Sequence, residues 1–230
     1  GMGYHLLQQS FLAENNIVFG LMLFRLLVLH QPRITLRGMN CQPQFELFAK
    51  WVTKQLDPAH KESALSKSPA ARSMAWCTVS NAYAVFRRKH REVLLPLVEY
   101  AVVDISSAER TEVKQAAVTF LYNVALHQGQ DTKKKSDDDQ AVSDLQVSML
   151  CTCLDGIMDE QDSVTQLRRL LVAARLLRNE TREEKNATTN EPVASLIRDL
   201  GFDQSIRDLA SPETDVGKLA SDVAQLLDSN

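Results

Sequence analysis

Two stretches of this chain repeat one pattern 42 residues apart, and each ends in an asparagine. Residues 75–81 (AWCTVSN) and 117–123 (AVTFLYN) both run from an alanine through mainly apolar residues to Asn81 and Asn123. Asparagine is unfavourable inside a helix because its side chain competes for backbone hydrogen bonds, so its recurrence suggests a shared role. A period of 42 residues lies in the range of armadillo and HEAT repeats, which contain two or three helices each. The alternative is that one asparagine caps a neighbouring loop and the other recurs by chance.

Composition favours a single all-helical body. The 230 residues include only 8 glycines and 7 prolines, too few for the many turns of an all-β fold. A chain of this length can bury about 70% of the surface that it exposes when extended, so it can form a core unaided. The net charge is −3 and no basic block stands out, which argues against nucleic acid as a partner.

Cysteine usage and hydropathy indicate a cytosolic or nuclear protein. Cys41, Cys77, Cys151 and Cys153 form no metal-ligand pattern, and we interpret them as reduced thiols. The apolar run from Ile17 to Leu29 is too short for a membrane span. Residues 1–3 (GMG) resemble a scar of cloning before a start residue, so residues 1–230 are expected to be one domain of a larger protein.

Helix signals divide the chain into about ten helices with short links. Serine before proline marks two helix starts, with Ser68 and Ser211 as expected N-caps, and Ser106 or Ser107 is expected to open a third helix. Polar loops are expected at 129–140 and 179–190. The expected helices are two within 4–30, broken near Asn15 and Asn16, then 43–56, 69–86, 88–103 with a bend or restart at Pro96, 107–127, 141–158, 163–177, 191–200, a short one to 209, and a last one starting at 211–212. Many short helices, together with a sequence pattern that recurs after 42 residues, predict an α-solenoid.

Four segments, in the same order along the chain, resemble the PUL domain, the C-terminal module of phospholipase-activating protein. Residues 24–30 (FRLLVLH) resemble its Leu-Arg-Leu-Leu-x-x-His segment, and residues 116–123 (AAVTFLYN) are similar to its Ala-Leu-Ala-Thr-Leu-x-x-Asn helix. Residues 169–173 (RLLVA) match a run in the family, and residues 200–206 (LGFDQSI) are similar to its Leu-Gly-Val-Asp-x-x-Ile segment.

This resemblance implies an armadillo-like α-solenoid of about six repeats, a right-handed superhelix with a concave groove and no catalytic activity. It implies that the partner is the acidic, flexible C-terminal tail of the AAA ATPase valosin-containing protein, in the ubiquitin-dependent degradation pathway. Groove arginines of the family fall on Arg25 and Arg169, and Asn81 and Asn123 join them as candidate peptide-binding residues. A monomer without cofactor or metal is expected.

Each arginine also has a simpler interpretation. Arg25 is the only charge in its apolar run, so it snorkels to solvent, pairs with a neighbouring helix or lines a cleft. Arg169 is adjacent to Arg168, and only one of them can face a groove; the apolar register and the motif favour Arg169.

The chain also departs from the family at three positions. Met22 replaces a common aspartate, Cys77 replaces a third arginine, and Arg175 replaces a glycine, so the preference for the tail can differ. The PUL domain also occurs in fusions with thioredoxin-like and desumoylating-peptidase modules, so the parent protein stays open.

Two other classes of function compete with peptide binding. An enzyme needs grouped catalytic residues, yet the histidines fall singly. Cys77 is the one nucleophile candidate, and the favoured alternative is that it is a buried packing thiol. A scaffold for protein assembly would use an exposed apolar helix face and would form a stable oligomer. The histidines are His5, His30, His60, His90 and His127.

Overall fold

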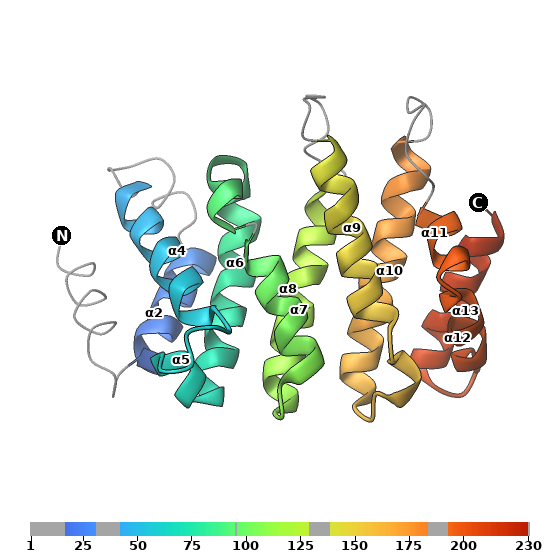
Figure 1. Cartoon of the computed structure of the whole chain (residues 1–230), viewed down its shortest axis with the longest axis horizontal. Coiled ribbons are helices and arrows are strands. Elements are labelled where there is room, and N and C mark those ends of the chain that lie inside the picture. The colour runs from blue at the N-terminus through green and yellow to red at the C-terminus, as the bar shows by residue number, and fades with distance from the viewer. Residues whose placement is uncertain (1–16, 31–41, 95, 129–138, 184–192, 230) are drawn as a thin grey trace. The chain divides into compact units, whose positions relative to one another are not determined.

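The elements of this protein are helices, as its low glycine and proline content predicts. The computed structural model describes residues 17–30, 42–94, 96–128, 139–183 and 193–229, and within these ranges it contains no strand (Figure 1). The all-α class is therefore confirmed, whereas the solenoid with about six repeats stays a prediction. In the part of the chain that the structure describes, no helix combines the length and apolar character that a membrane span requires.

The chain divides into two compact units, residues 1–120 and 121–230. The division falls inside one helix, between Phe120 and Leu121, and each unit is described by itself. The expectation of one domain across residues 1–230 stays a prediction.

The first unit is built on a long central helix, α6, against which α2, α4, α5 and α7 pack. Trp76 of α6 is fully buried, and its ring centroid lies 5.3 Å from that of Phe120. Leu21 and Leu56 extend this core to α2 and α4. The helices of this unit are α2 (Ile17–His30), α4 (Gln42–Leu56), α5 (Ala64–Lys67), α6 (Pro69–Leu94), α7 (Pro96–Ser107) and the start of α8 (Thr111–Gln128).

Several of the expected helix starts and faces are present in the first unit. The Ser68 hydroxyl accepts a hydrogen bond from the Ala71 N–H at 3.3 Å, so Ser68 is the N-cap of α6, and α7 restarts at Pro96. On α4 the expected apolar face is buried at Phe48, Ala49 and Val52.

Two expectations for the first unit are wrong. Helix α6 does not stop near residue 86 but continues to Leu94, because no glycine or proline interrupts residues 70–94. Ser106 and Ser107 do not open a helix: they end α7, where their hydroxyls donate to the carbonyl oxygens of Val102 and Val103. Serine can return a hydrogen bond to the preceding turn, so the residue type alone does not separate a helix start from a helix end.

The second unit is organised around α10, which packs against α9 and α13, while α12 also packs on α13. Two glycines have left-handed backbone conformations that make its tight links, Gly156 with φ 60° and Gly201 with φ 73°. Its described helices are the end of α8, then α9 (Asp139–Leu154), the 3-10 turn η2 (Ile157–Asp159), α10 (Ser163–Glu183), α11 (Val193–Asp199), α12 (Phe202–Leu209) and α13 (Asp215–Ser229).

Three expectations for the second unit need correction. Helix α9 ends at Leu154 rather than 158, because left-handed Gly156 breaks it, and α10 continues past 177 to Glu183. Ser211 is not the N-cap of the last helix. The cap is Thr214, whose hydroxyl accepts from the Gly217 N–H at 3.0 Å, so the helix starts three residues later than the proline signal indicates.

Candidate ligand-binding site

Arg25 lies on α2 at the border between a buried face and an exposed one. The buried face carries Leu21, Phe24 and Val28, and Arg25 itself is half-buried. Its Nε is shielded from solvent and has no hydrogen-bond partner among the described residues. Leaving a buried donor unsatisfied costs about 1–3 kcal/mol, so this N–H favours an acceptor that arrives from outside the described part of the chain.

Asn81, on α6, has the same property. Its side chain is half-buried, and the amide nitrogen Nδ2 is shielded without an acceptor in the described ranges. An asparagine that caps a loop would use its amide in hydrogen bonds to that loop. The unused donor at Nδ2 therefore agrees better with a binding role than with a loop cap.

A polar contact between α2 and α6 places these two residues at one level. The hydroxyl of fully buried Thr78 donates to the carbonyl oxygen of Met74 in its own helix at 2.7 Å and also lies 3.3 Å from the carbonyl oxygen of Leu21. Both helices run upward in Figure 1. Arg25 is four residues beyond Leu21, and Asn81 is three residues beyond Thr78, so both lie about one helical turn above this contact. At that level each helix carries one buried donor without an acceptor among the described residues.

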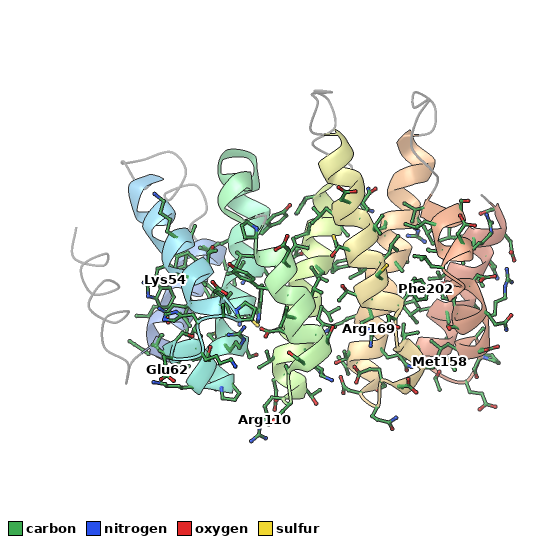
Figure 2. The ribbon with its side chains drawn as sticks, viewed as in Figure 1. Lys54, Glu62, Arg110, Met158, Arg169 and Phe202 are labelled. Carbon is green, nitrogen blue, oxygen red and sulfur yellow. The ribbon has the colours of Figure 1, made fainter. Side chains whose placement is uncertain are left out.

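Arg169, the other arginine indicated by the resemblance, is buried and fully engaged. It lies on α10, near the lower end of α9 in Figure 2, and only 6% of it is exposed. Its Nε donates to the carbonyl oxygen of Cys153 at 3.0 Å, and its Nη2 donates to those of Thr152, at 3.2 Å, and Asp155. Its Nη1 lies 3.6 Å from the carboxylate of Glu160. The side chain therefore binds the carbonyl groups that end α9, where a cation is favoured by the helix dipole.

Burial also shifts the pKa values of two side chains at this helix end, Arg169 and Cys153. It lowers the pKa of Arg169, while the nearby Cys153, Glu160 and Asp155 act in the opposite direction. The same burial raises the pKa of the Cys153 thiol to about 12. Cys153 is thus a packing thiol and not a nucleophile.

Asn123, the second repeated asparagine, is half-buried on the part of α8 that belongs to the second unit. Arg25 and Asn81 lie in the first unit, and Asn123 and Arg169 lie in the second. A groove shared by all four residues stays a prediction.

The three positions that depart from the family have different surroundings. Met22 is 49% exposed and Cys77 is half-buried. Arg175 of α10 donates from Nη2 to the carbonyl oxygen of Leu126 at 3.2 Å, in the last turn of α8. Among the described residues, no group of histidine, cysteine and carboxylate side chains could hold a metal ion.

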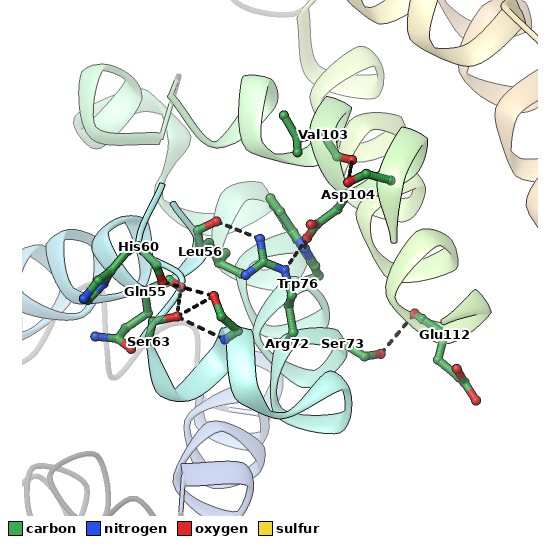
Figure 3. Close-up of polar contacts among 12 residues, drawn as sticks. Gln55, Leu56, His60, Ser63, Arg72, Ser73, Trp76, Val103, Asp104 and Glu112 are labelled. Atoms are coloured by element: carbon green, nitrogen blue, oxygen red, sulfur yellow. Dashed lines mark hydrogen bonds and ion pairs between the residues drawn. The ribbon is translucent and has the colours of Figure 1, made fainter. Parts of the chain in front are cut away.

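Arginines that cap a neighbouring helix recur in both units, and the sequence analysis missed this role. Arg72 of α6 donates to the carbonyl oxygen of Leu56 at the end of α4 at 2.8 Å (Figure 3), and Arg198 of α11 donates to that of Leu227 near the end of α13. Arg169 and Arg175 do the same for α9 and α8. For Arg72 the sequence did contain an indication of this role, namely its position on the helix. Arg72 precedes the buried Trp76 and Val79 by four and seven residues, which places it on the buried face of α6.

Helix α2 also exposes a stripe of large apolar side chains on the face beside Arg25. We call it the α2 stripe. Its spacing of three and four residues places its members along one side of the helix. They are Val18 (38% exposed), Phe19 (58%), Met22 (49%), Leu26 (40%) and Leu29 (49%).

Comparison with known proteins leaves the family open. No protein-family model matches the chain, and neither a curated protein nor a solved structure matches it significantly.

Proposed function

We propose that this chain is a non-catalytic peptide-binding domain that resembles the PUL domain and recognises the acidic C-terminal tail of the AAA ATPase valosin-containing protein. In this proposal the domain is an armadillo-like α-solenoid that acts in the cytosol or nucleus and links the ATPase to ubiquitin-dependent degradation. The observation that carries it is the pair of donors without acceptors, Arg25 Nε and Asn81 Nδ2, at one level of α2 and α6.

A carboxylate suits this pair of donors. The guanidinium of Arg25 can give charge-assisted hydrogen bonds to a carboxylate, and the amide of Asn81 can add a neutral one. Arg25 is only partly buried, so part of its side chain is open to solvent although its Nε is shielded. An acidic, flexible peptide supplies such acceptors along its whole length.

The other two predicted residues enter the proposal differently. Asn123 is proposed to hydrogen-bond the peptide backbone. Arg169 would have to release the carbonyl groups at the end of α9 before it could bind a ligand, so we assign it to holding α9 against α10.

Calorimetric titration of the tail peptide, with its free carboxylate, tests the proposal. We expect a dissociation constant in the micromolar range, on the order of −7 to −8 kcal/mol, because a flexible peptide loses ordering entropy on binding. Arg25→Glu should weaken binding at least tenfold, and so should amidation of the terminal carboxylate if that group is the acceptor. Added salt should weaken binding as well, because the contact is ionic.

Lys54→Glu is the matched control, since it makes the same charge reversal at an exposed position on α4 (Figure 2). This variant should bind as the unmodified chain does. Equal affinity of Arg25→Glu and Lys54→Glu would remove Arg25 from the site, and no binding by the unmodified chain would overturn the proposed function.

A scaffold for protein assembly is the second candidate, and the observation that favours it is the α2 stripe. An exposed apolar face of this kind marks an interaction surface. Light scattering separates the two candidates, because the scaffold requires a stable oligomer and the peptide-binding domain is expected to be a monomer.

A further inference from the structure

Arg175 of α10 has, like Arg25, an Nε that is shielded from solvent and has no hydrogen-bond partner among the described residues. In the part of the chain that the structure describes, its polar contact is the bond from Nη2 to the carbonyl oxygen of Leu126, at 3.2 Å, and it forms no ion pair. Arg175 is half-buried, so its charge is only partly hydrated. A guanidinium in such surroundings favours an anion that arrives from outside.

This property distinguishes Arg175 from Arg169 on the same helix. Arg169 donates from both Nε and Nη2 to carbonyl oxygens at the end of α9 and has Glu160 as a counter-ion. Arg175 contacts the last turn of α8 through one nitrogen, which uses one of the five N–H donors of a guanidinium. Capping α8 therefore does not account for the whole side chain.

The contact with Leu126 places Arg175 near Asn123. Asn123 precedes Leu126 by three residues on α8, so the two lie on one side of that helix and about 4.5 Å apart along its axis. Arg175 and Asn123 are both half-buried. Arg25 and Asn81 form a comparable pair in the first unit. In each unit, an arginine with an unused Nε accompanies one of the two asparagines of the 42-residue pattern.

The side of α10 that carries Arg175 is basic. Arg168 lies seven residues before it and Arg178 three residues after it, which places all three on one side of the helix. Residues 163–178 of α10 include no acidic residue. Positive charge that gathers on one side of a helix raises the local concentration of an acidic ligand.

We propose that Arg175 and Asn123 form a carboxylate-binding site in the second unit, and that Arg175 has the ligand role that the resemblance gave to Arg169. The choice of an acidic peptide tail as ligand rests on the proposed function. On binding, the guanidinium turns to present Nε to a carboxylate of the peptide and holds it by charge-assisted hydrogen bonds, while the amide of Asn123 binds the adjoining peptide backbone. The PUL pattern has glycine at position 175, so this site is particular to this chain.

Calorimetric titration of the full chain with the tail peptide tests the role of Arg175. Arg175→Met removes the charge but keeps an apolar stem, and it should weaken binding at least tenfold. Lys218→Met removes the same charge at an exposed position of the second unit and should bind as the unmodified chain does. Arg175→Lys should recover only part of the affinity, because an ammonium lacks the planar fork of a guanidinium.

A second measurement uses the unmodified chain and stays valid if the variants fold poorly. Nuclear magnetic resonance of the arginine Nε–H groups reports each one separately. Saturation with the tail peptide should slow hydrogen exchange at the Nε of Arg175 at least tenfold. The Nε of Arg169, which already donates to Cys153, should keep its rate.

The outcomes separate this site from the proposed function. If the tail peptide binds but Arg175→Met and Lys218→Met have equal affinity, or exchange at Arg175 does not change, the site is overturned and the proposed function stands. If the tail does not bind but an unrelated peptide with the same number of carboxylates slows exchange at Arg175, the proposed function is overturned and the site stands. Binding of neither peptide overturns both.

Discussion

Arg72 and Asp104 form a buried ion pair that joins α6 to α7, with the Nε of Arg72 2.7 Å from Oδ2 of Asp104. The same oxygen accepts a hydrogen bond from Nε1 of Trp76 at 2.6 Å (Figure 3). Because Arg72 also donates to Leu56, three helices meet at one polar cluster in an otherwise apolar core. The cluster fixes how α4, α6 and α7 pack.

Asp104→Ala should destabilise the first unit strongly. The side chains of Arg72 and Asp104 are only 11% and 8% exposed, so the change leaves a buried guanidinium without its counter-ion and an indole without its acceptor. Removing one partner of such a pair costs about 3–5 kcal/mol. Urea unfolding measures the loss. Glu62→Ala, in the exposed pair with Lys67, is the control and should change stability little, because solvent screens that pair. Similar losses in both variants would contradict the structural role of Asp104.

Arg169→Met should destabilise the second unit. The change leaves the carbonyl groups at the end of α9 without their donor and Glu160 without its partner, at a cost of about 3–5 kcal/mol. Arg169→Lys keeps the charge but not the planar fork, so it should recover only part of that loss. Thermal unfolding followed by circular dichroism measures both variants. Arg207→Met, which breaks the exposed pair with Asp228, is the control and should have little effect. An Arg169→Met variant as stable as the unmodified chain would return Arg169 to the list of ligand contacts.

Gly217→Ala should destabilise the chain although it lies inside a helix. Replacing glycine by alanine in a helix normally stabilises by about 1 kcal/mol. Here a Cβ at position 217 would meet the backbone nitrogen of Ser211 at 2.6 Å and its Cβ at 2.7 Å, too close for any real contact. We expect a net loss of about 1–3 kcal/mol in chemical unfolding. Lys218→Ala, exposed on the same helix, should be nearly neutral, and a stabilised Gly217→Ala variant would show that the turn at Ser211 does not pack as described.

Replacing Ser68 or Thr214 by alanine should lower the free energy of unfolding more than replacing Ser211 does. Ser68→Ala and Thr214→Ala each remove a hydroxyl that accepts from a first-turn N–H, at a cost of about 1 kcal/mol. The Ser211 hydroxyl accepts only from the N–H two residues on, at 3.3 Å and exposed, so Ser211→Ala should cost less. Denaturant titrations of the three variants compare them directly. A larger loss at Ser211 than at Thr214 would restore the helix start that the proline signal indicates.

The sequence predicted the helices well where local chemistry decides them. Ser68, Pro96 and Gly201 act over one turn, and α6, α7 and the end of α11 follow them. One wrong boundary arose where two local signals compete. Ser107 can open a helix or close one, and only the packing of α7 decides.

The candidate site could be predicted from the sequence less well than the helices. The apolar run around Arg25 left three possibilities open, because a lone charge there can snorkel to solvent, pair with a neighbouring helix or line a cleft, and a pattern cannot show which of these an arginine does. Arg169 shows the second case, because its carbonyl partners are 14–17 residues away along the chain. The unpaired donors of Arg25 and Asn81 depend on the packing of helices 57 residues apart at the Leu21–Thr78 contact, which no local signal reports.

Cys153 should resist alkylation in the folded chain while its neighbour Cys151, on the same helix, reacts. Cys153 is fully buried and Cys151 is partly exposed. Burial holds the pKa of Cys153 at about 12, against 9.0 for an ordinary thiol, so at pH 8 only about one molecule in ten thousand carries the thiolate there. Mass spectrometry after a short iodoacetamide pulse measures both sites.

The same shift predicts how stability depends on pH. Because the folded pKa of Cys153 is raised, the unfolded thiol ionises first as the pH rises, and the unfolded state binds fewer protons between about pH 9 and 12. Cys153 therefore lowers stability progressively across that window and contributes nothing below it. Cys153→Ala should flatten the alkaline limb of the stability curve. The iodoacetamide experiment also tests the burial on which this pH dependence rests. Equal alkylation rates at Cys151 and Cys153 would show that α9 opens to solvent without unfolding of the second unit.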